Sequence, residues 1–167
     1  MNIDEMLEAV RALPFGDYAE CGVWKGYMAQ KIAAGMDRNE TLWLFDSFQG
    51  HGEPGKFDDP VRHPRGRYAD TSIEEVCALI PRAVIIPGFI PDTLIVDRPF
   101  RFVHIDLDHY LPTKAACEFF KPRMVAGGII RFDDYGFSEC PGATKAVNEV
   151  FGRDNVLSQD YRWVNAS

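Results

Sequence analysis

Apolar residues recur along this chain in two alternating patterns. Segments in which they return every three or four positions predict amphipathic helices, and short continuous apolar runs between those segments predict buried strands. The expected helices are Ile3–Leu13, Tyr27–Met36, Thr71 to about Ile80, Pro112–Lys121 and Ala143–Phe151. The expected strands are Tyr18–Val23, Thr41–Phe45, Val84–Pro87, Phe102–Ile105 and Gly127–Phe132, followed by a terminal pair at Asn155–Ser158 and Tyr161–Val164.

This alternation of strand and helix predicts an α/β fold in three layers. Continuous apolar strands are typical of a parallel sheet that helices cover on both faces, and the terminal strands are expected to add an antiparallel edge. The chain has 167 residues, which is the usual size of one domain. We therefore expect a single domain over residues 1–167, with an N-terminal helix within residues 1–14.

Residues 49–70 interrupt the periodic pattern. The segment is rich in Gly, Pro, His, Asp and Arg and shows neither a helical nor a strand period. A loop of this length is uncommon in a small domain, where it is usually a lid, a binding loop or a disordered segment. We expect it to act as a lid over a site.

Composition and charge narrow the classes of partner. Apolar residues make up 46% of the chain and charged residues 26%, as in ordinary globular proteins, and the net charge is −7. That charge disfavours binding to nucleic acid or to an anionic membrane. No apolar run reaches the roughly 18 residues that span a bilayer, and the first residues lack the pattern of a signal peptide. The four cysteines are widely spaced, as expected for reduced thiols in the cytoplasm.

Candidate ligand-binding residues follow the first two predicted strands, because open α/β sheets bind ligands at the carboxyl ends of their strands. Gly22, near the end of the first predicted strand, and Gly26, in the turn that follows it, would allow a ligand to approach the backbone. Their spacing departs from the dinucleotide fingerprint G-x-G-x-x-G, and turn formation alone is the alternative. Asp46 ends the second strand, where an acid either accepts hydrogen bonds from ribose hydroxyls or caps a turn.

Acidic residues gather after two later strands. Asp106 follows Phe102–Ile105, and Asp133 and Asp134 follow Gly127–Phe132. Neighbouring strands lie about 4.8 Å apart, so the three carboxylates can converge. Carboxylates so placed must take up protons or hold a cation, and ligands that are all oxygen favour Mg²⁺. The alternative is that individual aspartates cap helices or pair with nearby arginines.

Among the four histidines, His63 is the candidate general base, because a residue of the 49–70 loop can fold over a substrate. The alternative for His63 is an exposed loop histidine without a role. His51 lies in the same loop, His104 lies inside a predicted strand, and His109 follows the Asp106 segment.

In combination, these motifs resemble the macrocin O-methyltransferase (TylF-type) family of class I S-adenosylmethionine-dependent methyltransferases. The similarity extends over about residues 15–152, and its more specific parts are the D-x-D-x-Y and D-D-Y-G motifs. The matching segments are Gly16–Gly26, Phe45–Gly50, Pro87–Phe89 with Asp92–Leu94, Ile105–Tyr110 with Thr113, Gly127–Gly128, and Asp133–Gly136. The resemblance implies a Rossmann-like class I methyltransferase fold, with a mostly parallel sheet and an antiparallel C-terminal strand.

The resemblance also implies roles for individual residues. The residues that would bind S-adenosylmethionine are Glu20, Gly22, Trp24, Gly26, Asp46, Ser47, Phe48, Gly88 and Phe89. Within this set, Asp46 would bind the ribose hydroxyls, and Gly88 and Phe89 would border the adenine. Asp106, Asp133 and Asp134 would hold Mg²⁺, as in the metal-dependent members of the family.

The expected activity is therefore a Mg²⁺-assisted transfer of the methyl group of S-adenosylmethionine to a hydroxyl of a small molecule, such as a sugar or another natural product. Asp106, through the metal, and His63, as the base, are the expected catalytic residues. The alternatives are a non-catalytic module that binds the cofactor or another nucleoside, and a nicotinamide-dependent oxidoreductase, which the missing third glycine disfavours. A homodimer is expected from the apolar first helix and the frequency of two-fold assemblies.

Overall fold

The structure is a computed structural model that describes residues 2–37, 39–156 and 160–162. Its helices are α1 (Ile3–Arg11), α2 (Tyr27–Ala34), α3 (Ile73–Leu79), α4 (Tyr110–Phe120) and α5 (Pro141–Phe151). Its strands are β1 (Asp17–Cys21), β2 (Leu42–Asp46), β3 (Val84–Pro87), β4 (Phe100–Ile105), β5 (Met124–Phe132) and β6 (Asp160–Arg162). Short 3₁₀ helices follow α4 and α5, at Lys121–Arg123 and Arg153–Asn155.

The strands form one sheet in the order β3-β2-β1-β4-β5-β6. The first five are parallel to their neighbours, while the three residues of β6 pair with β5 in the antiparallel direction. The chain builds outward from β1 in one direction and from β4 in the other. The carboxyl ends of these two central strands therefore mark the switch point at which an open α/β sheet binds its ligands.

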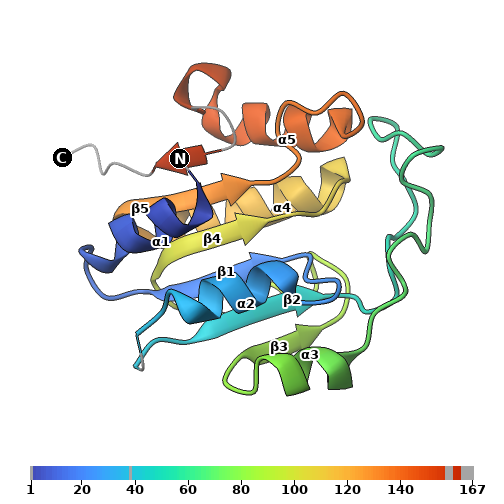
Figure 1. The fold of residues 1–167 in the computed structure, drawn as a ribbon. Coiled ribbons are helices and arrows are strands. Elements are labelled where there is room, and N and C mark those ends of the chain that lie inside the picture. The colour runs from blue at the N-terminus through green and yellow to red at the C-terminus, as the bar shows by residue number, and fades with distance from the viewer. Residues whose placement is uncertain (1, 38, 157–159, 163–167) are drawn as a thin grey trace.

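Helices cover both faces of the sheet (Figure 1). Apolar residues of α1, α2 and α3 pack against one face, and those of α4 and α5 pack against the other. Along β4, Phe102 belongs to the first of these cores and Val103 to the second, because successive side chains of a strand point to opposite faces. Three layers of this kind explain why the central strands read as continuous apolar runs.

Most of the predicted elements are present, with ends shifted by a few residues. Val23, predicted to end the first strand, lies in the turn beyond β1, and α4 begins at Tyr110 rather than at Pro112. Pro112 is tolerated there because the first turn of a helix has no intrahelical partner for its N–H groups. At the start of α3, Ser72 is the N-cap residue. Its hydroxyl accepts a hydrogen bond from the Glu75 N–H, at 3.3 Å, as is typical of a serine in this position.

The predicted terminal pair of strands is only partly described. The first, Asn155–Ser158, is wrong at its start, because Asn155 belongs to a 3₁₀ helix, and residues 157–158 lie outside the described residues. The second, Tyr161–Val164, overlaps β6, and its residues 163–164 also lie outside them.

The apolar face of α1 is used within the domain. Met6, Leu7 and Val10 are at most 2% exposed and belong to the core beneath α2 and α3. The expected homodimer therefore receives no support from this helix, and it stays a prediction that rests on the frequency of two-fold assemblies. Among the described residues, no helix has the length and apolarity needed to cross a bilayer.

Candidate functional site

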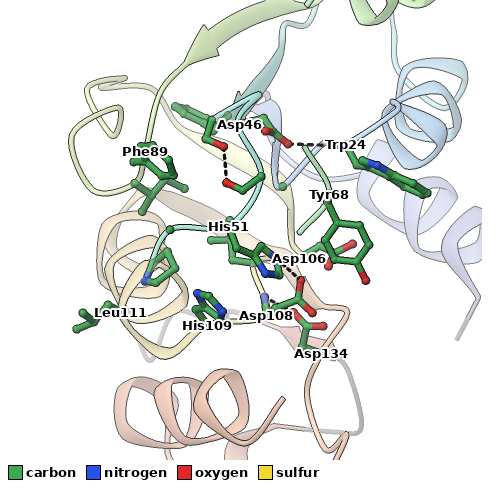
Figure 2. A pocket seen from close by; sticks show the side chains of 18 of the residues that line it. Trp24, Asp46, His51, Tyr68, Phe89, Asp106, Asp108, His109, Leu111 and Asp134 are labelled. Atoms are coloured by element: carbon green, nitrogen blue, oxygen red, sulfur yellow. Dashed lines mark hydrogen bonds and ion pairs between the residues drawn. The ribbon is translucent and has the colours of Figure 1, made fainter. Parts of the chain in front are cut away.

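A cavity of about 470 Å³ opens at the carboxyl ends of the parallel strands. Its walls come from the residues that follow β1, β2, β3, β4 and β5, together with part of the 49–70 loop and the start of α4. Asp46 and Trp24 lie at one end and Asp106, Asp108 and Asp134 at the other (Figure 2). His51 lies between these two ends. The cavity therefore has two chemically different halves.

The turn after β1 forms the wall nearest the switch point. Gly22 lines the cavity with a φ of 86°, and a Cβ at this position would lie 1.7 Å from the Asp106 carbonyl oxygen. Only glycine fits so close an approach of two strand ends. Gly26 has a different place: it precedes α2 with a φ of 79° and faces Val76, Leu79 and Ile80 rather than the cavity.

Asp46 ties the turn after β1 to the end of β2. One carboxylate oxygen accepts hydrogen bonds from the N–H groups of Val23, at 2.7 Å, and Trp24, at 2.9 Å. The other accepts from the Phe48 N–H at 2.7 Å. The turn-stabilising alternative for Asp46 is therefore present, and the same side chain also lines the cavity. Oδ1, which accepts only one of these three hydrogen bonds, has a further lone pair for a ligand.

The remaining residues expected to bind the cofactor divide into two groups. The group that lines the cavity consists of Trp24, Ser47, Gly88 and Phe89. Glu20 and Phe48 are not among the lining residues. Phe48 packs against the core beneath α2 and α3. The Glu20 carboxyl is buried behind the wall, and burial together with the charges of Asp106, Asp46 and Asp133 raises its pKa well above the ordinary value.

The three aspartates expected to bind a metal share the cavity but face two different neighbourhoods. Donor atoms of Asp106 and Asp133 lie within 4.8 Å of each other and of a His104 nitrogen. An oxygen of Asp134 lies within the same distance of Asp108 and of the Cys140 sulfur. Among the described residues, no group that meets this distance combines all three of the expected aspartates.

Burial and mutual repulsion disfavour ionisation of the carboxylates in this acidic half. Burial and the charges of the neighbouring aspartates raise the pKa of Asp106 well above its ordinary value, and burial and the charge of Asp108 raise the pKa of Asp134 to about 7. Arg131 supplies part of the compensation, since its guanidinium lies 2.9 Å from Asp133 Oδ1. The alternative of pairing with an arginine is thus present for Asp133.

His63 is buried, at 5% exposure, so the alternative of an exposed loop histidine is wrong. Its Nδ1 lies 3.1 Å from Asp108 Oδ1, and its Nε2 lies 3.4 Å from the Cys140 sulfur. Burial lowers the pKa of His63, against the opposing influence of Asp108. His63 is not among the residues that line the cavity, whereas Asp108 is, so the imidazole lies behind that carboxylate.

Asp108 is the residue that the sequence motifs included but did not single out. Its φ of 57° is unusual for a residue other than glycine. His51 Nε2 lies 2.9 Å from its Oδ2, and its own N–H donates to Asp134 Oδ2 at 2.8 Å. Burial acts to raise the pKa of Asp108, but the hydrogen bond from His51 and the charges of His51 and His63 hold that pKa below its ordinary value.

The other two histidines differ in position. His109 lines the cavity, with its Nε2 2.9 Å from the His63 carbonyl oxygen and its ring 4.6 Å from that of His51. His104 is buried within β4, as expected, and burial and the charge of Arg131 lower its pKa to about 3. His51 was missed as a site residue because nothing in its local sequence indicates that the loop returns to Asp108.

The 49–70 loop folds back on itself over the strand ends. The His51 N–H donates to the Arg67 carbonyl oxygen, and the Gly66 N–H donates to the His51 carbonyl oxygen, both at 2.9 Å. Asp58 Oδ1 accepts the Tyr110 N–H at 2.7 Å, which fixes the loop to the start of α4. These bonds place His51 and His63 beside Asp108.

The sequence matches a known protein family. A family model described as a methyltransferase domain covers residues 19–135. A tetracenomycin-type rhamnosyl 4'-O-methyltransferase of Streptomyces olivaceus is 29% identical over 95% of this chain and 68% of its own length. The demethyldecarbamoylnovobiocin O-methyltransferase of Streptomyces niveus is 32% identical over 86% of this chain. This chain spans 61% of the length of the Streptomyces niveus protein.

Solved structures show the same fold. The O-methyltransferase NovP superposes on 99% of this chain and 78% of its own, with a TM-score of 0.79 and 26% identity. The calicheamicin methyltransferase CalS11 superposes on 96% of this chain and 78% of its own, with a TM-score of 0.77 and 22% identity. The expected Rossmann-like methyltransferase fold is thereby confirmed.

Proposed function

The chain belongs to the methyltransferase-domain family, and from that membership we propose that it is an S-adenosylmethionine-dependent O-methyltransferase acting on a hydroxyl of a sugar or related natural product. As part of this proposal, the D-x-D-x-Y and D-D-Y-G motifs support membership of the macrocin-type enzymes within that family. The observation that carries the proposal is a cavity with the Gly22 turn and Asp46 at one end and the Asp108 carboxylate at the other. The Streptomyces olivaceus relative, whose name specifies O-methylation of a rhamnosyl compound, supports the substrate class.

The Asp46 end is the cofactor half of the proposed site. Gly22 leaves the backbone open to the methionine part of the cofactor, and the free lone pair of Asp46 Oδ1 would accept a ribose hydroxyl. Phe89, 44% exposed, offers an apolar face to the adenine beside Gly88. Gly26 forms the turn before α2, and the Glu20 carboxyl lies buried behind the wall. When bound, S-adenosylmethionine supplies the reactive methyl group.

Mg²⁺ is the metal that the acidic half would hold. The donors are carboxylate oxygens of Asp106 and Asp133, with Asp134 beside them, and hard cations prefer such ligands. The raised pKa values of Asp106 and Asp134, caused by burial and by neighbouring carboxylates, show a repulsion that a divalent cation would relieve. When bound, Mg²⁺ lowers the pKa of a coordinated hydroxyl. Because Arg131 pairs with Asp133, one ligand is shared with a guanidinium.

Asp108 and His51 are the groups placed to accept the proton of the acceptor hydroxyl, since both line the cavity. The lowered pKa of Asp108, maintained by the hydrogen bond and charge of His51 against the effect of burial, keeps its carboxylate ionised at neutral pH. His63 is the positioning residue behind it, within 3.1 Å. This arrangement modifies the expected role of His63, which would act through Asp108 rather than on the substrate.

The 49–70 loop would exclude water from the reacting groups. Through His51 and Tyr68 it contributes directly to the cavity wall. Exclusion of water strengthens the electrostatic interactions among the remaining groups, and in-line alignment of hydroxyl, methyl group and sulfur supplies much of the rate enhancement. We propose that this loop is the lid of the site.

Product analysis tests the proposal. The protein is incubated with methyl-labelled S-adenosylmethionine, Mg²⁺ and a panel of sugars, glycosides and phenols, and the products are examined by mass spectrometry. We expect one labelled methyl group on an acceptor oxygen. Tight cofactor binding without transfer to any member of the panel would instead support a non-catalytic binding module. A melting temperature raised by NAD(P) and not by S-adenosylmethionine would support an oxidoreductase.

A further inference from the structure

A thiol, an imidazole and two carboxylates converge at the start of α5. The Cys140 sulfur lies 3.4 Å from His63 Nε2, 3.4 Å from Asp108 Oδ1 and 3.5 Å from Asp134 Oδ1. All four residues are at most 8% exposed. The polar neighbours of Cys140 distinguish it from Cys21 and Cys117, which are also buried but lie in the apolar core.

These spacings match the edges of a tetrahedral metal site. Zinc–sulfur bonds are about 2.3 Å and zinc–nitrogen or zinc–oxygen bonds about 2.0–2.2 Å, so a tetrahedral arrangement separates sulfur from each other donor by about 3.5 Å. The three distances from Cys140 Sγ are 3.4, 3.4 and 3.5 Å. Donor atoms of Cys140, Asp108 and Asp134 also lie within 4.8 Å of one another, and His63 Nε2 reaches the sulfur from the loop side.

The hydrogen bonding of His63 leaves room for such a ligand. Nδ1 is buried and, among the described residues, has no hydrogen-bond partner, although Asp108 Oδ1 lies 3.1 Å away. Nε2 faces only the weakly polar Cys140 sulfur. A buried imidazole with both nitrogens so poorly satisfied requires an explanation, and a missing ion is one of the standard ones.

Both carboxylate donors are already oriented by hydrogen bonds. The Asp108 N–H donates a hydrogen bond to Asp134 Oδ2 at 2.8 Å, and His51 Nε2 lies at hydrogen-bond distance, 2.9 Å, from Asp108 Oδ2. In both residues the remaining oxygen, Oδ1, is the one that faces Cys140. Asp108 and Asp134 also line the cavity, which provides a path of entry.

We propose that Cys140, Asp134 and Asp108, with His63 beside the sulfur, form a Zn²⁺ site that shares Asp134 with the ligands proposed for Mg²⁺. A thiolate and an imidazole favour Zn²⁺ and disfavour Mg²⁺. On binding, the thiol proton is released to solvent and a sulfur–zinc bond forms. If the proposed O-methyltransferase function holds, Zn²⁺ inhibits it, because the ion occupies Asp108 and takes Asp134 from the magnesium ligands.

Direct metal binding tests the site without reference to catalysis. Co²⁺ is the probe, because it replaces Zn²⁺ in tetrahedral sites and a thiolate ligand gives a sulfur-to-cobalt charge-transfer band. The full-length protein, freed of metal with a chelator, is titrated with Co²⁺ and then with Zn²⁺. We expect the charge-transfer band to saturate at one Co²⁺ per chain and to disappear when Zn²⁺ displaces it.

Two matched cysteine variants assign the band. Cys140→Ser keeps a good N-cap residue and should abolish the band and weaken Zn²⁺ binding by about 10–100-fold or more. Cys77→Ser, at an exposed position of α3, should change neither, and thermal unfolding verifies that both variants fold. A wild-type protein without the band, or a band that survives in Cys140→Ser, would overturn the proposal. Failure of methyl transfer alone would leave these spectra unchanged and would count only against the proposed function.

Discussion

His63 Nδ1 lies 3.1 Å from Asp108 Oδ1, although the two residues come from a long irregular loop and from the end of β4. The contact is completed by His51, which holds the other oxygen of the same carboxylate at 2.9 Å. The Asp108 carboxylate thus contacts two histidines of the loop and also lines the cavity. This relationship connects the loop to the proposed chemistry and leads to the first prediction.

Asp108→Asn should lower kcat by about 10²–10⁴-fold, the contribution of a positioned general base, with little change in cofactor affinity. Asparagine tolerates the left-handed backbone conformation of this position, so the fold should be retained. Steady-state kinetics and calorimetric titration with S-adenosylmethionine measure the two quantities. Asp4→Asn, an exposed residue in the first turn of α1, is the control. Equal kcat values in the two variants would exclude Asp108 as the base.

Asp133→Ala should abolish metal-dependent turnover while cofactor binding stays measurable. The substitution removes one proposed Mg²⁺ ligand at the acidic half of the cavity and leaves the Asp46 half intact. Activity is measured across a range of Mg²⁺ concentrations after removal of metal with a chelator. Undiminished turnover would contradict the metal-binding role of Asp133.

Gly22→Ala should destabilise the protein far more than Gly66→Ala. The two glycines have similar φ values, 86° and 78°, so both variants incur the left-handed backbone cost of about 1–2 kcal/mol. A Cβ at Gly66 meets nothing within 4 Å, whereas one at Gly22 meets the Asp106 carbonyl oxygen at 1.7 Å. Urea unfolding measures the difference. Equal losses of stability would show that the backbone contact between these strand ends is easily relieved.

The free energy of unfolding should depend on pH through Asp134. Burial and the charge of Asp108 raise its folded-state pKa to about 7, against roughly 3.9 in the unfolded chain. Between these values the folded state retains a proton that the unfolded chain has lost. The group therefore stabilises the fold at low pH, and that stabilisation declines by up to about 1.4 kcal/mol per pH unit as the pH rises through this window.

Asp134→Asn removes this titration. In metal-free buffer, wild type should lose stability relative to the variant as the pH rises from about 5 to about 7, and added Mg²⁺ should restore part of the loss. Chemical unfolding at a series of pH values measures the difference. A constant difference between the two proteins would mean that Asp134 titrates normally.

The alternation of apolar periods was sufficient to predict the order of strands and helices from residue 3 to residue 151. It could not predict element ends such as the start of α4, where Pro112 is accommodated in the first turn rather than beginning the helix. Nor could it show that the apolar face of α1 is consumed by the domain's own core, because an amphipathic pattern does not specify its partner.

Residues at strand ends were similarly accessible to prediction. Parallel strands bring their carboxyl ends to one edge, so Gly22, Asp46, Asp106, Asp133 and Asp134 were expected to face one site, and all of them line the cavity. His51 carries no such signal, because the path of an irregular loop depends on bonds such as that between Asp58 and the Tyr110 N–H. For Cys140, the sequence predicts only a reduced thiol, because nothing local to it indicates that His63, Asp108 and Asp134 lie nearby.

The sequence by itself determined the α/β class, the glycine turn and the acidic edge, because these follow from local periodicity and from the geometry that all parallel sheets share. Only the tertiary structure decided how the acids are divided, with Asp133 beside Arg131 and Asp134 beside Asp108 and Cys140. It also decided that His63 lies behind Asp108 rather than in solvent. Side-chain pairing between distant segments depends on the path of the loop and on which carboxylates become buried away from water. Neither of these can be predicted from a local sequence pattern.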